Sequence, residues 1–284
     1  MEHVYELDAW RRYANEQRAL GRSISLVPTM GALHAGHASL FRLAKESGDV
    51  VLATIFVNPR QFNVAADLRS YPRTPEDDVL VAKESGVDCL IEPTLASMWP
   101  DYPAPTPTTV SVRGIGDVLE GADRSGHFDG VASVVAKLFA VTGPCRAYFG
   151  EKDFQQLAVV RQMVRDLALD VEVVGCPIVR DEDGLAISSR NVQLSNEGRA
   201  QALALSRAVA AVSTPDTPSN HRAHLREVLD AAGVEVAYAE VVDPVTFLAA
   251  HDGEVGVRRA LVAGVVEGVR LIDNAPVTLV AKGS

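Results

Sequence analysis

One glycine-rich segment limits the folds open to this chain more than any other stretch of it. The segment runs from Val27 to His37 and reads VPTMGALHAGH. The apolar run that ends at Val27 predicts a strand, and apolar residues at helical spacing predict a helix that starts near His37. The segment is therefore predicted to be a strand-to-helix turn, where Gly31 and Gly36 can take positive φ and let a ligand approach the backbone.

The chemistry of this turn favours a bound phosphate group. The free N–H groups and the positive dipole end of the following helix attract anions. His34 and His37 are three residues apart, so both can lie on one face of the first helical turn. Together these groups predict a polyphosphate that undergoes chemistry here. Two alternatives stay open: surface or packing histidines, or half of a metal site, although no Cys or third His stands at ligand spacing.

A second strand is predicted after this helix. The run from Val50 to Val57 is apolar and rich in β-branched residues, which is typical of a strand buried on both faces of a parallel sheet. Strand, helix and strand then form a βαβ unit. Asn58 and Gln61 follow the second strand, and ligands of open α/β sheets gather at the carboxyl ends of strands. We expect both side chains near the histidines, with helix capping by a polar loop as the equal alternative.

The next helix is predicted to start at Thr74, a typical N-cap residue, with Pro75 at the first helical position. The acidic residues 76–78 suit the positive end of that helix, so capping explains them without any ligand. A magnesium role for Asp77 or Asp78 is the competing hypothesis.

Three later segments carry further candidates for phosphate binding. A glycine-rich loop at 120–130 holds Arg124 and His127 before an apolar helix at 131–141, where His127 is better explained as an anchoring group than as a catalyst. The residues 147–153 repeat the strand-to-helix pattern, and Lys152 can either reach a phosphate or form a solvated pair with a glutamate. An acidic, glycine-containing turn at 181–184 then leads to Ser188, Ser189 and Arg190. These groups could grip phosphate oxygens, or a serine could cap a helix.

Composition narrows the class of protein. The 284 residues allow one large or two modest domains, and the net charge of −10 argues against a general nucleic-acid surface. No apolar run approaches the roughly 18 residues of a membrane span. The first ten residues hold three acids and no apolar core, so we expect no signal peptide. Three scattered cysteines favour a reduced, cytoplasmic setting.

The C-terminal part carries fewer chemical signals. Before that part, the proline-rich residues 93–107 are expected to form an irregular loop, and residues 109–112 after it are expected to form a strand. Beyond residue 176 we expect helices at 197–212 and around 225–229, and strands at 234–242, 258–266 and 269–272. The predicted domains are therefore 1–176, a nucleotide- and substrate-binding domain, and 177–284, a smaller α+β domain.

Six motifs in one order give the chain a specific resemblance. They are PTMGALHAGH (28–37), FVNPRQF (56–62), YPRTPED (71–77), RSGHFDGV (124–131), FGEKDFQQL (149–157) and ISSRN (187–191). The H-x-G-H turn resembles the signature of the nucleotidylyltransferase superfamily, and the whole set resembles the pantothenate synthetase (pantoate–β-alanine ligase) family along nearly the whole chain. The resemblance implies an α/β fold with a Rossmann-like, doubly wound parallel sheet and a C-terminal domain that acts as a lid.

The resemblance also implies a two-step, ATP-dependent amide synthesis. The carboxylate of (R)-pantoate attacks the α-phosphorus of ATP and gives a pantoyl adenylate and pyrophosphate. The amine of β-alanine then displaces AMP and gives pantothenate, a precursor of coenzyme A. No protein nucleophile is needed, so catalysis rests on positioning and on stabilising charge at phosphate oxygens. Mg²⁺ is expected with the ATP.

Site residues carry over position by position. His37, held by the family as a proton donor, is better described as a hydrogen-bond donor to the transition state. The implied catalytic residues are His37, His34, Lys152, Ser188, Ser189 and Arg190. The implied ATP-binding residues are Met30, Gly31, Ala32, Leu33, His34, Ala35, Gly36, His37, Gly150, Glu151, Lys152, Asp153, Val179, Ile187, Ser188, Ser189 and Arg190. Pantoate and β-alanine are expected at Gln61 and Gln156, with Asn58, Tyr71 and Arg124 as weaker candidates.

The expected binding partners follow from the resemblance, and two alternative functions stay open. The resemblance implies a homodimer with small-molecule substrates, and with neither nucleic acid nor membrane as a partner. One rival is a nucleotidyltransferase that passes AMP or CMP to a phosphate acceptor. The other is a non-catalytic nucleotide-binding relative, which predicts the loss of a histidine, Lys152 or Arg190. None of these residues is lost.

Overall fold

The computed structural model describes residues 1–281, and these form two compact units. The first unit comprises Met1–Glu151 and Val159–Pro177. The second comprises Lys152–Ala158 and the described residues from Ile178 on. Because helix α8 (Phe154–Asp166) begins in one unit and ends in the other, the chain passes more than once between them.

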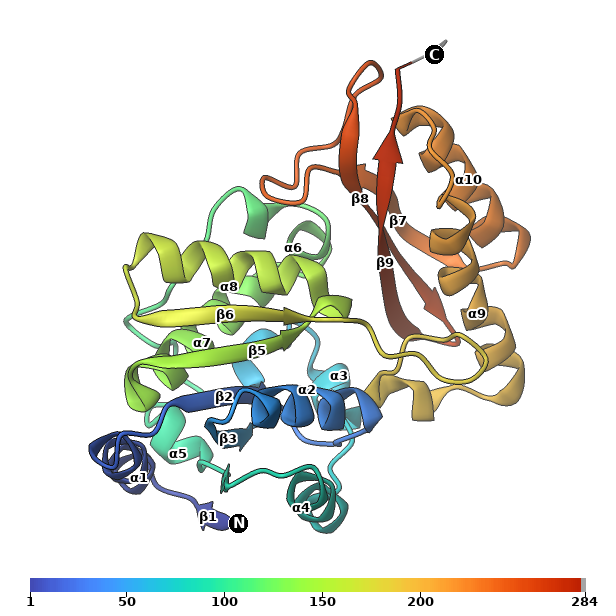
Figure 1. Ribbon diagram of the computed structural model, residues 1–284. Helices are drawn as coiled ribbons and strands as arrows, with labels where there is room; N and C mark the ends of the chain where they lie inside the picture. The colour runs from blue at the N-terminus through green and yellow to red at the C-terminus, as the bar shows by residue number, and fades with distance from the viewer. Residues whose placement is uncertain (282–284) are drawn as a thin grey trace. The chain divides into compact units, whose positions relative to one another are not determined.

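The first unit is built on a six-stranded parallel sheet (Figure 1). Its strand order is β1-β4-β3-β2-β5-β6, which reverses direction between β2 and β5. Ligands of doubly wound sheets bind where the order reverses, outside the carboxyl ends of the strands. The α/β class predicted from the sequence is confirmed. The strands are β1 (Glu2–Val4), β2 (Ile24–Thr29), β3 (Val50–Ile55), β4 (Cys89–Ile91), β5 (Cys145–Gly150) and β6 (Val171–Cys176).

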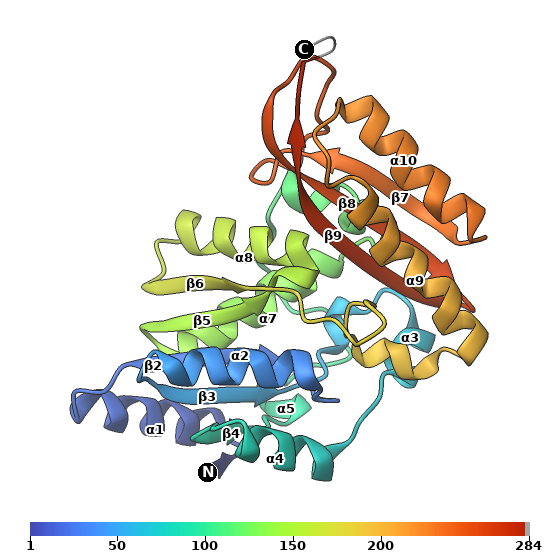
Figure 2. The same cartoon turned by 45° about the vertical axis from the view of Figure 1, so that its right-hand side comes forward.

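Helices cover both faces of this sheet. Helix α2 contacts β2, β3, β5 and α4 (Figure 2). Its Phe41 packs into an apolar cluster with Val27 and Leu90 of the strands. Helix α7 contacts β2 and α1 and is buried along most of its length. The helices are α1 (Leu7–Ala19), α2 (Ala35–Glu46), α3 (Ala65–Ser70), α4 (Pro75–Glu84), α5 (Leu95–Met98), α6 (Glu120–Asp123), α7 (His127–Thr142), and the 3-10 turns η1 (Pro59–Gln61), η2 (Ile115–Asp117) and η3 (Glu151–Asp153).

Two local predictions in this unit were wrong. Residues 109–112 form no strand, because the Val110 N–H donates to the Ser133 hydroxyl of α7 at 2.9 Å instead of to a sheet. Strand β1 was missed, since it is only three residues long and pairs with β4 at the edge of the sheet. None of the helices in residues 1–281 is long and apolar enough to cross a membrane.

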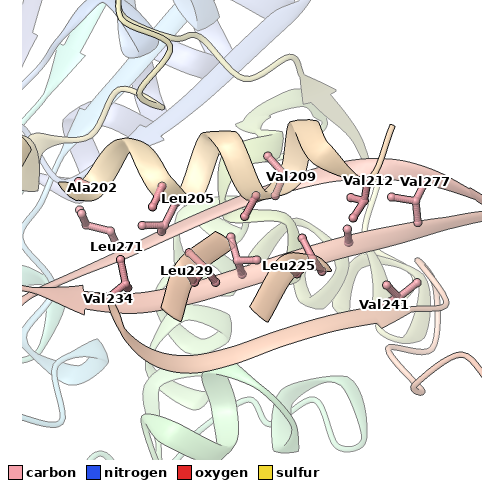
Figure 3. Close-up of a cluster of buried hydrophobic side chains, with 14 of the residues drawn as sticks. Ala202, Leu205, Val209, Val212, Leu225, Leu229, Val234, Val241, Leu271 and Val277 are labelled. Atoms are coloured by element: carbon pink, nitrogen blue, oxygen red, sulfur yellow. The ribbon is translucent and has the colours of Figure 1, made fainter. Parts of the chain in front are cut away.

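The second unit is a three-stranded antiparallel sheet with two helices. Strands β7 (Glu235–Val242), β8 (Gly256–Val266) and β9 (Val269–Leu279) lie in sequence order. Helices α9 (Asn196–Ala211) and α10 (Pro218–Ala231) pack on the sheet through an apolar core that includes Leu205, Leu225, Leu229 and Val241 (Figure 3). Strand β9 runs well beyond the predicted end at residue 272. The 3-10 turn η4 (Ser189–Gln193) precedes α9.

Candidate active site

The turn after β2 is wrapped around a carboxylate. Gly31 and Ala32 both have positive φ, +78° and +49°, which turns successive backbone N–H groups toward one point. Asp78 of α4 lies at that point. Its Oδ2 accepts from the Ala32 N–H at 3.0 Å and its Oδ1 from the Leu33 N–H at 2.7 Å. A Cβ at Gly31 would lie 2.8 Å from Asp78 Oδ2, so only glycine fits there.

Asp77 and Asp78 do not fit the magnesium site that was considered for them. Asp78 is 2% exposed, and its Oδ1 also accepts from the Thr74 hydroxyl at 3.0 Å. Asp77 is exposed, so the two carboxylates point to different surroundings. Within residues 1–281 no group of three or more His, Cys, Asp or Glu side chains could hold a metal ion. The physical reason is that buried Asp78 already accepts three hydrogen bonds, two from the turn and one from Thr74.

The two histidines stack at the start of α2. This helix begins at Ala35, so His34 is its N-cap and His37 its third residue, slightly earlier than predicted. The imidazole rings lie 4.0 Å apart between centroids. The His34 N–H donates to His37 Nδ1 at 3.3 Å, which leaves the proton of a neutral His37 on Nε2. His37 can therefore offer an N–H donor to a ligand.

Gly36 serves this stack in a way that differs from the prediction. It lies within α2 and is not among the glycines with positive φ. A Cβ at this position would lie 3.0 Å from Cε1 and Nδ1 of the His34 ring. The H-x-G-H spacing thus makes room for the imidazole that stacks on its neighbour.

Asn58 holds the next loop together. It is 1% exposed, and its Nδ2 donates to Gly130 O at 3.1 Å and to Gln61 Oε1 at 3.2 Å. Its Oδ1 accepts from Trp99 Nε1 at 3.0 Å and from the Arg60 N–H at 3.3 Å. These contacts match the capping alternative for Asn58. Gly130 belongs to the same arrangement, because a Cβ there would lie 2.2 Å from Arg60 O.

Gln61 is positioned by both its side chain and its backbone. Its Nε2 lies 2.9 Å from Met30 Sδ, which links it to the turn after β2. Its carbonyl accepts from His127 Nδ1 at 2.7 Å. Since a carbonyl only accepts, the other ring nitrogen of His127 accepts from Arg124 Nη1 at 3.2 Å. His127 is therefore an anchoring group, as predicted, and it orients Arg124.

Tyr71 and Arg124 are also placed by the first unit. Tyr71 is buried, and its ring meets that of Phe62 edge to face, with centroids 5.7 Å apart. Arg124 lies 3.7 Å from Glu120 and 3.9 Å from Asp67. Both residues thus have defined contacts around the loop that carries Gln61.

The turn after β5 carries Lys152. Gly150 ends β5 and Glu151 starts the 3-10 turn η3 in the first unit, whereas Lys152 belongs to the second unit. The Lys152 ammonium lies 3.7 Å from Asp153, so the ion pair involves this neighbour. Its backbone carbonyl accepts from Asn274 Nδ2 at 2.9 Å. Gln156 follows on the first turn of α8 and is half-buried.

Residues 179–187 form a small hairpin. The Ile187 N–H donates to Val179 O at 3.0 Å, and Gly184 takes φ +94° at the tip. Arg199 of α9 donates to Asp181 at 2.7 Å and to Asp183 at 2.8 Å. The hydrogen bond from Arg199 lowers the pKa of Asp183 below its ordinary value. The predicted acidic turn is confirmed as a turn, and α9 anchors it.

Ser188 follows the hairpin and caps η4. Its Oγ accepts from the Arg190 N–H at 3.3 Å, which matches the capping alternative. A hydroxyl that accepts one bond still has its own proton to donate, so capping leaves Ser188 able to bind an oxygen ligand. Ser189 and Arg190 lie on the 3-10 turn that this cap begins.

Several supporting residues were not found from the sequence. Asp273 and Asn274 of β9 are each 2% exposed, and they bind Arg180 of the hairpin and the Lys152 carbonyl. In the sequence, these two polar residues follow directly after an apolar run. The prediction therefore ended the strand before them. The only local sign of the contacts of Asp78 was its spacing of four residues from Thr74. Its other partners, Ala32 and Leu33, lie about 45 residues away in sequence.

Fold and turn together define a doubly wound α/β protein with an H-x-G-H turn at the switch point of its sheet. The chain belongs to the pantoate-beta-alanine ligase family, whose model matches residues 2–276.

Similar proteins cover nearly the whole chain. A pantothenate synthetase of Cereibacter sphaeroides is 48% identical over 272 residues, which are 94% of this chain and 96% of the relative. The crystal structure of pantothenate synthetase from Thermus thermophilus matches with a TM-score of 0.87 and 43% identity, over 97% of this chain and 99% of that one. A pantoate-beta-alanine ligase of Francisella tularensis, complexed with beta-gamma ATP and beta-alanine, matches with a TM-score of 0.82 and 31% identity, over 97% of both chains.

Proposed function

We propose that this protein condenses (R)-pantoate with β-alanine at the expense of ATP and yields pantothenate, AMP and pyrophosphate. The observation that carries the proposal is the end-to-end match to the pantoate-beta-alanine ligase family. A relative that matches over 97% of both chains was crystallised with an ATP compound and β-alanine. The residues assigned to the proposed chemistry are all present in the chain.

The reaction proceeds in two displacements. A pantoate carboxylate oxygen attacks the α-phosphorus of ATP, the bond to the bridging oxygen breaks, and pyrophosphate leaves. The neutral amine of β-alanine then attacks the acyl carbon, AMP leaves with the bonding electron pair, and the nitrogen loses a proton. Charge builds on phosphate oxygens in the first step, so fixed hydrogen-bond donors there lower the barrier.

His37 is the donor best prepared for that charge in the first unit. Its Nδ1 accepts from the His34 N–H, so Nε2 carries the proton that a phosphate oxygen can accept. The N–H groups of Ala35 and Gly36, at the start of α2, add the positive end of the helix. The Ala32 and Leu33 N–H groups donate to Asp78, so their assigned role is to shape the turn around the nucleotide. The histidines and the N-terminal end of α2 are assigned to the phosphates.

The second unit supplies the cations and hydroxyls. Lys152 is assigned to the phosphates and Asp153 to the ribose. Ser188, Ser189 and Arg190 are assigned to the departing pyrophosphate, with charge-assisted hydrogen bonds as the physical basis. Val179 and Ile187 form the first hydrogen-bonded pair of the hairpin that leads to them, and they are assigned to the nucleotide. Gly150 and Glu151, at the carboxyl end of β5, complete the ATP set.

The amides of Gln61 and Gln156 are assigned to pantoate. A carboxylate and hydroxyl groups need both donors and acceptors, and a primary amide offers both. Gln61 is well suited because Asn58 and Met30 hold its side chain and His127 holds its carbonyl. Asn58 acts through Gln61, while Tyr71 and Arg124 remain weaker candidates for direct contact.

Mg²⁺ is proposed to arrive with ATP as part of the substrate, bound by phosphate oxygens. Asp77 and Asp78 do not fit a protein-held ion, for the reasons given above. Two further predictions concern the whole protein: the C-terminal unit closes as a lid, and the protein forms a homodimer. Small-angle scattering with and without ATP tests closing, since an unchanged radius of gyration would contradict it. Analytical ultracentrifugation tests the dimer, which a single species near 30.4 kDa would rule out.

ATP–pyrophosphate exchange tests the function directly. With β-alanine absent, labelled pyrophosphate should enter ATP only when pantoate is present, because the adenylate is the intermediate that reverses. Exchange that needs no pantoate, or no exchange at all, would reject the proposed first step. Exchange that needs a phosphate ester in place of pantoate would identify a nucleotidyltransferase.

A further inference from the structure

We infer that Asp273 and Asn274, adjacent residues of β9, are positioning residues that align the two phosphate-directed segments of the second unit. One segment is the Lys152 turn and the other is the 179–187 hairpin that leads to Ser188, Ser189 and Arg190. The inference rests on the proposed function, because it takes the role of these segments from that proposal. Neither residue is expected to touch substrate.

Asn274 holds the Lys152 turn from one face of the sheet. Its Nδ2 donates to Lys152 O at 2.9 Å, and its Oδ1 accepts from Arg259 Nε at 2.7 Å. The guanidinium carbon of Arg259 lies 4.1 Å from the centroid of the Phe154 ring. The segment from Lys152 to Phe154 is therefore held at two points by one hydrogen-bonded pair of side chains, and both members of that pair are buried.

Asp273 holds the hairpin. Its Oδ2 accepts from Arg180 Nη1 at 2.6 Å and its Oδ1 from Arg180 Nη2 at 2.9 Å, which is a two-bond fork. Arg180 Nη1 also donates to Gly184 O at 3.1 Å, so the arginine crosses from one strand of the hairpin to its tip. The hydrogen bond to Asp273 raises the pKa of Arg180 above its ordinary value.

The strand itself explains why two neighbours serve two segments. Successive side chains of a strand point to opposite faces, so adjacent residues can bind groups on both sides of one sheet. Asp273 stands opposite Val262, a member of the core under α9 and α10, and Asn274 stands opposite Leu261. The Asn274 N–H also donates to Asp273 Oδ1 at 2.7 Å. The Asp273 carboxylate is thus also held by the backbone of Asn274.

Because Asp273 and Asn274 are buried, their hydrogen bonds favour one position of Lys152 O and of Arg180. Each residue is 2% exposed, and a buried polar group that loses its partner pays a desolvation cost that an exposed group avoids. The pair is therefore favourable only while Lys152 O and Arg180 stay in place. This property fixes the spacing between the Lys152 turn and the hairpin within the second unit.

The test uses isosteric changes in the full-length protein. Asp273→Asn removes the charge that binds Arg180, and Asn274→Asp replaces the donor to Lys152 O by an acceptor while keeping an oxygen for Arg259. Glu240→Gln is the matched control, because Glu240 binds Arg222 Nε at 2.7 Å in the same unit and contacts neither segment through that pair. Calorimetry then gives the Kd of ATP and of AMP for each protein.

Both β9 variants should bind ATP about tenfold more weakly, the size expected for one misplaced charged hydrogen bond, with AMP affinity changed less than about twofold. Glu240→Gln should leave the ratio of the two affinities at the wild-type value. A folded Asp273→Asn or Asn274→Asp protein with the wild-type ratio, or with equal losses for ATP and AMP, would overturn the inference. Wild-type protein without pantoate-dependent exchange would instead reject the proposed function, and the affinity ratios would still decide the positioning role.

Discussion

The turn at 30–34 in the first unit and the hairpin at 179–187 in the second are held in comparable ways. Each is a loop with a glycine at positive φ, and each is tied to a buried aspartate on a distant element. Asp78 of α4 serves the turn and Asp273 of β9 serves the hairpin, and both are 2% exposed. The difference is in the group that each carboxylate binds: backbone N–H groups at the turn, and an arginine side chain at the hairpin.

That difference sets what each aspartate controls. Backbone N–H groups have no freedom of their own, so Asp78 fixes the path of the chain through Gly31 and Ala32. An arginine side chain has several rotatable bonds, so Asp273 fixes the place of the hairpin and leaves its internal hydrogen bonds intact. Loss of Asp78 should therefore damage folding and activity together, whereas changes at the hairpin should act mainly through ligand affinity.

The largest expected effect is that of Asp78→Ala. The change removes the buried carboxylate that accepts from two backbone N–H groups and the Thr74 hydroxyl, so the free energy of unfolding should fall by about 3 kcal/mol or more. Urea unfolding measures it. Asp77→Ala is the control, because its side chain is exposed and surface changes stay within about 0.5 kcal/mol. Equal losses in the two variants, or a raised Mg²⁺ requirement in either one, would contradict the clamp.

His37→Ala should separate the chemistry of the turn from its shape. The imidazole accepts one hydrogen bond from the His34 N–H, so its removal leaves the Asp78 clamp intact. Turnover should fall about 10²-fold, the typical cost of one lost donor to a developing oxyanion. Steady-state kinetics with saturating substrates measures this. A variant that keeps near-normal kcat would remove His37 from the proposed role.

These two residues also show how far the sequence could be read. The strand-to-helix turn and its histidines follow from local signals, namely an apolar run, glycines and helical spacing, and the structure has this turn, although α2 begins at Ala35 and includes Gly36. The clamp by Asp78 depends on which helix packs beside the turn. That is a tertiary contact across some 45 residues, and the local pattern around Asp78 fits helix capping equally well.

Strand β9 shows the same limit in the second unit. Its start at Val269 was predicted, but the expected end at residue 272 was wrong because Asp273, Asn274 and Pro276 are poor strand formers. Pairing with β8 and the buried partners of the two polar side chains outweigh that propensity. Pro276 is tolerated since β9 is an edge strand. Polar residues that break a β pattern can thus be the most constrained part of a strand.

Gly36→Ala should sharpen the account of the turn with a smaller effect. A Cβ there would lie 3.0 Å from the His34 ring, so the imidazole must shift by a few tenths of an ångström. We expect kcat to fall about fivefold, because small displacements of positioned groups are costly. Stability should not fall, since alanine is a better helix former than glycine by up to about 1 kcal/mol. An unchanged kcat in this variant would mean that the ring position is not critical.

The smallest effect is expected at the tip of the hairpin, in Asp183→Asn. Arg199 lowers the pKa of Asp183, so this carboxylate stabilises the fold fully above its unfolded pKa of 3.8 and loses that contribution as the pH falls through its lower folded pKa. Because Asp183 is about one-third exposed, the contribution is screened and should stay below about 0.5 kcal/mol. Urea unfolding of both proteins should therefore show a small difference at pH 7 that shrinks below about pH 4. A difference that grows toward acid pH would show that Asp183 is held by something other than its charge. Since Arg199 also binds Asp181, ATP affinity should be nearly unchanged, in contrast to Asp273→Asn, where the hairpin loses the carboxylate that holds Arg180.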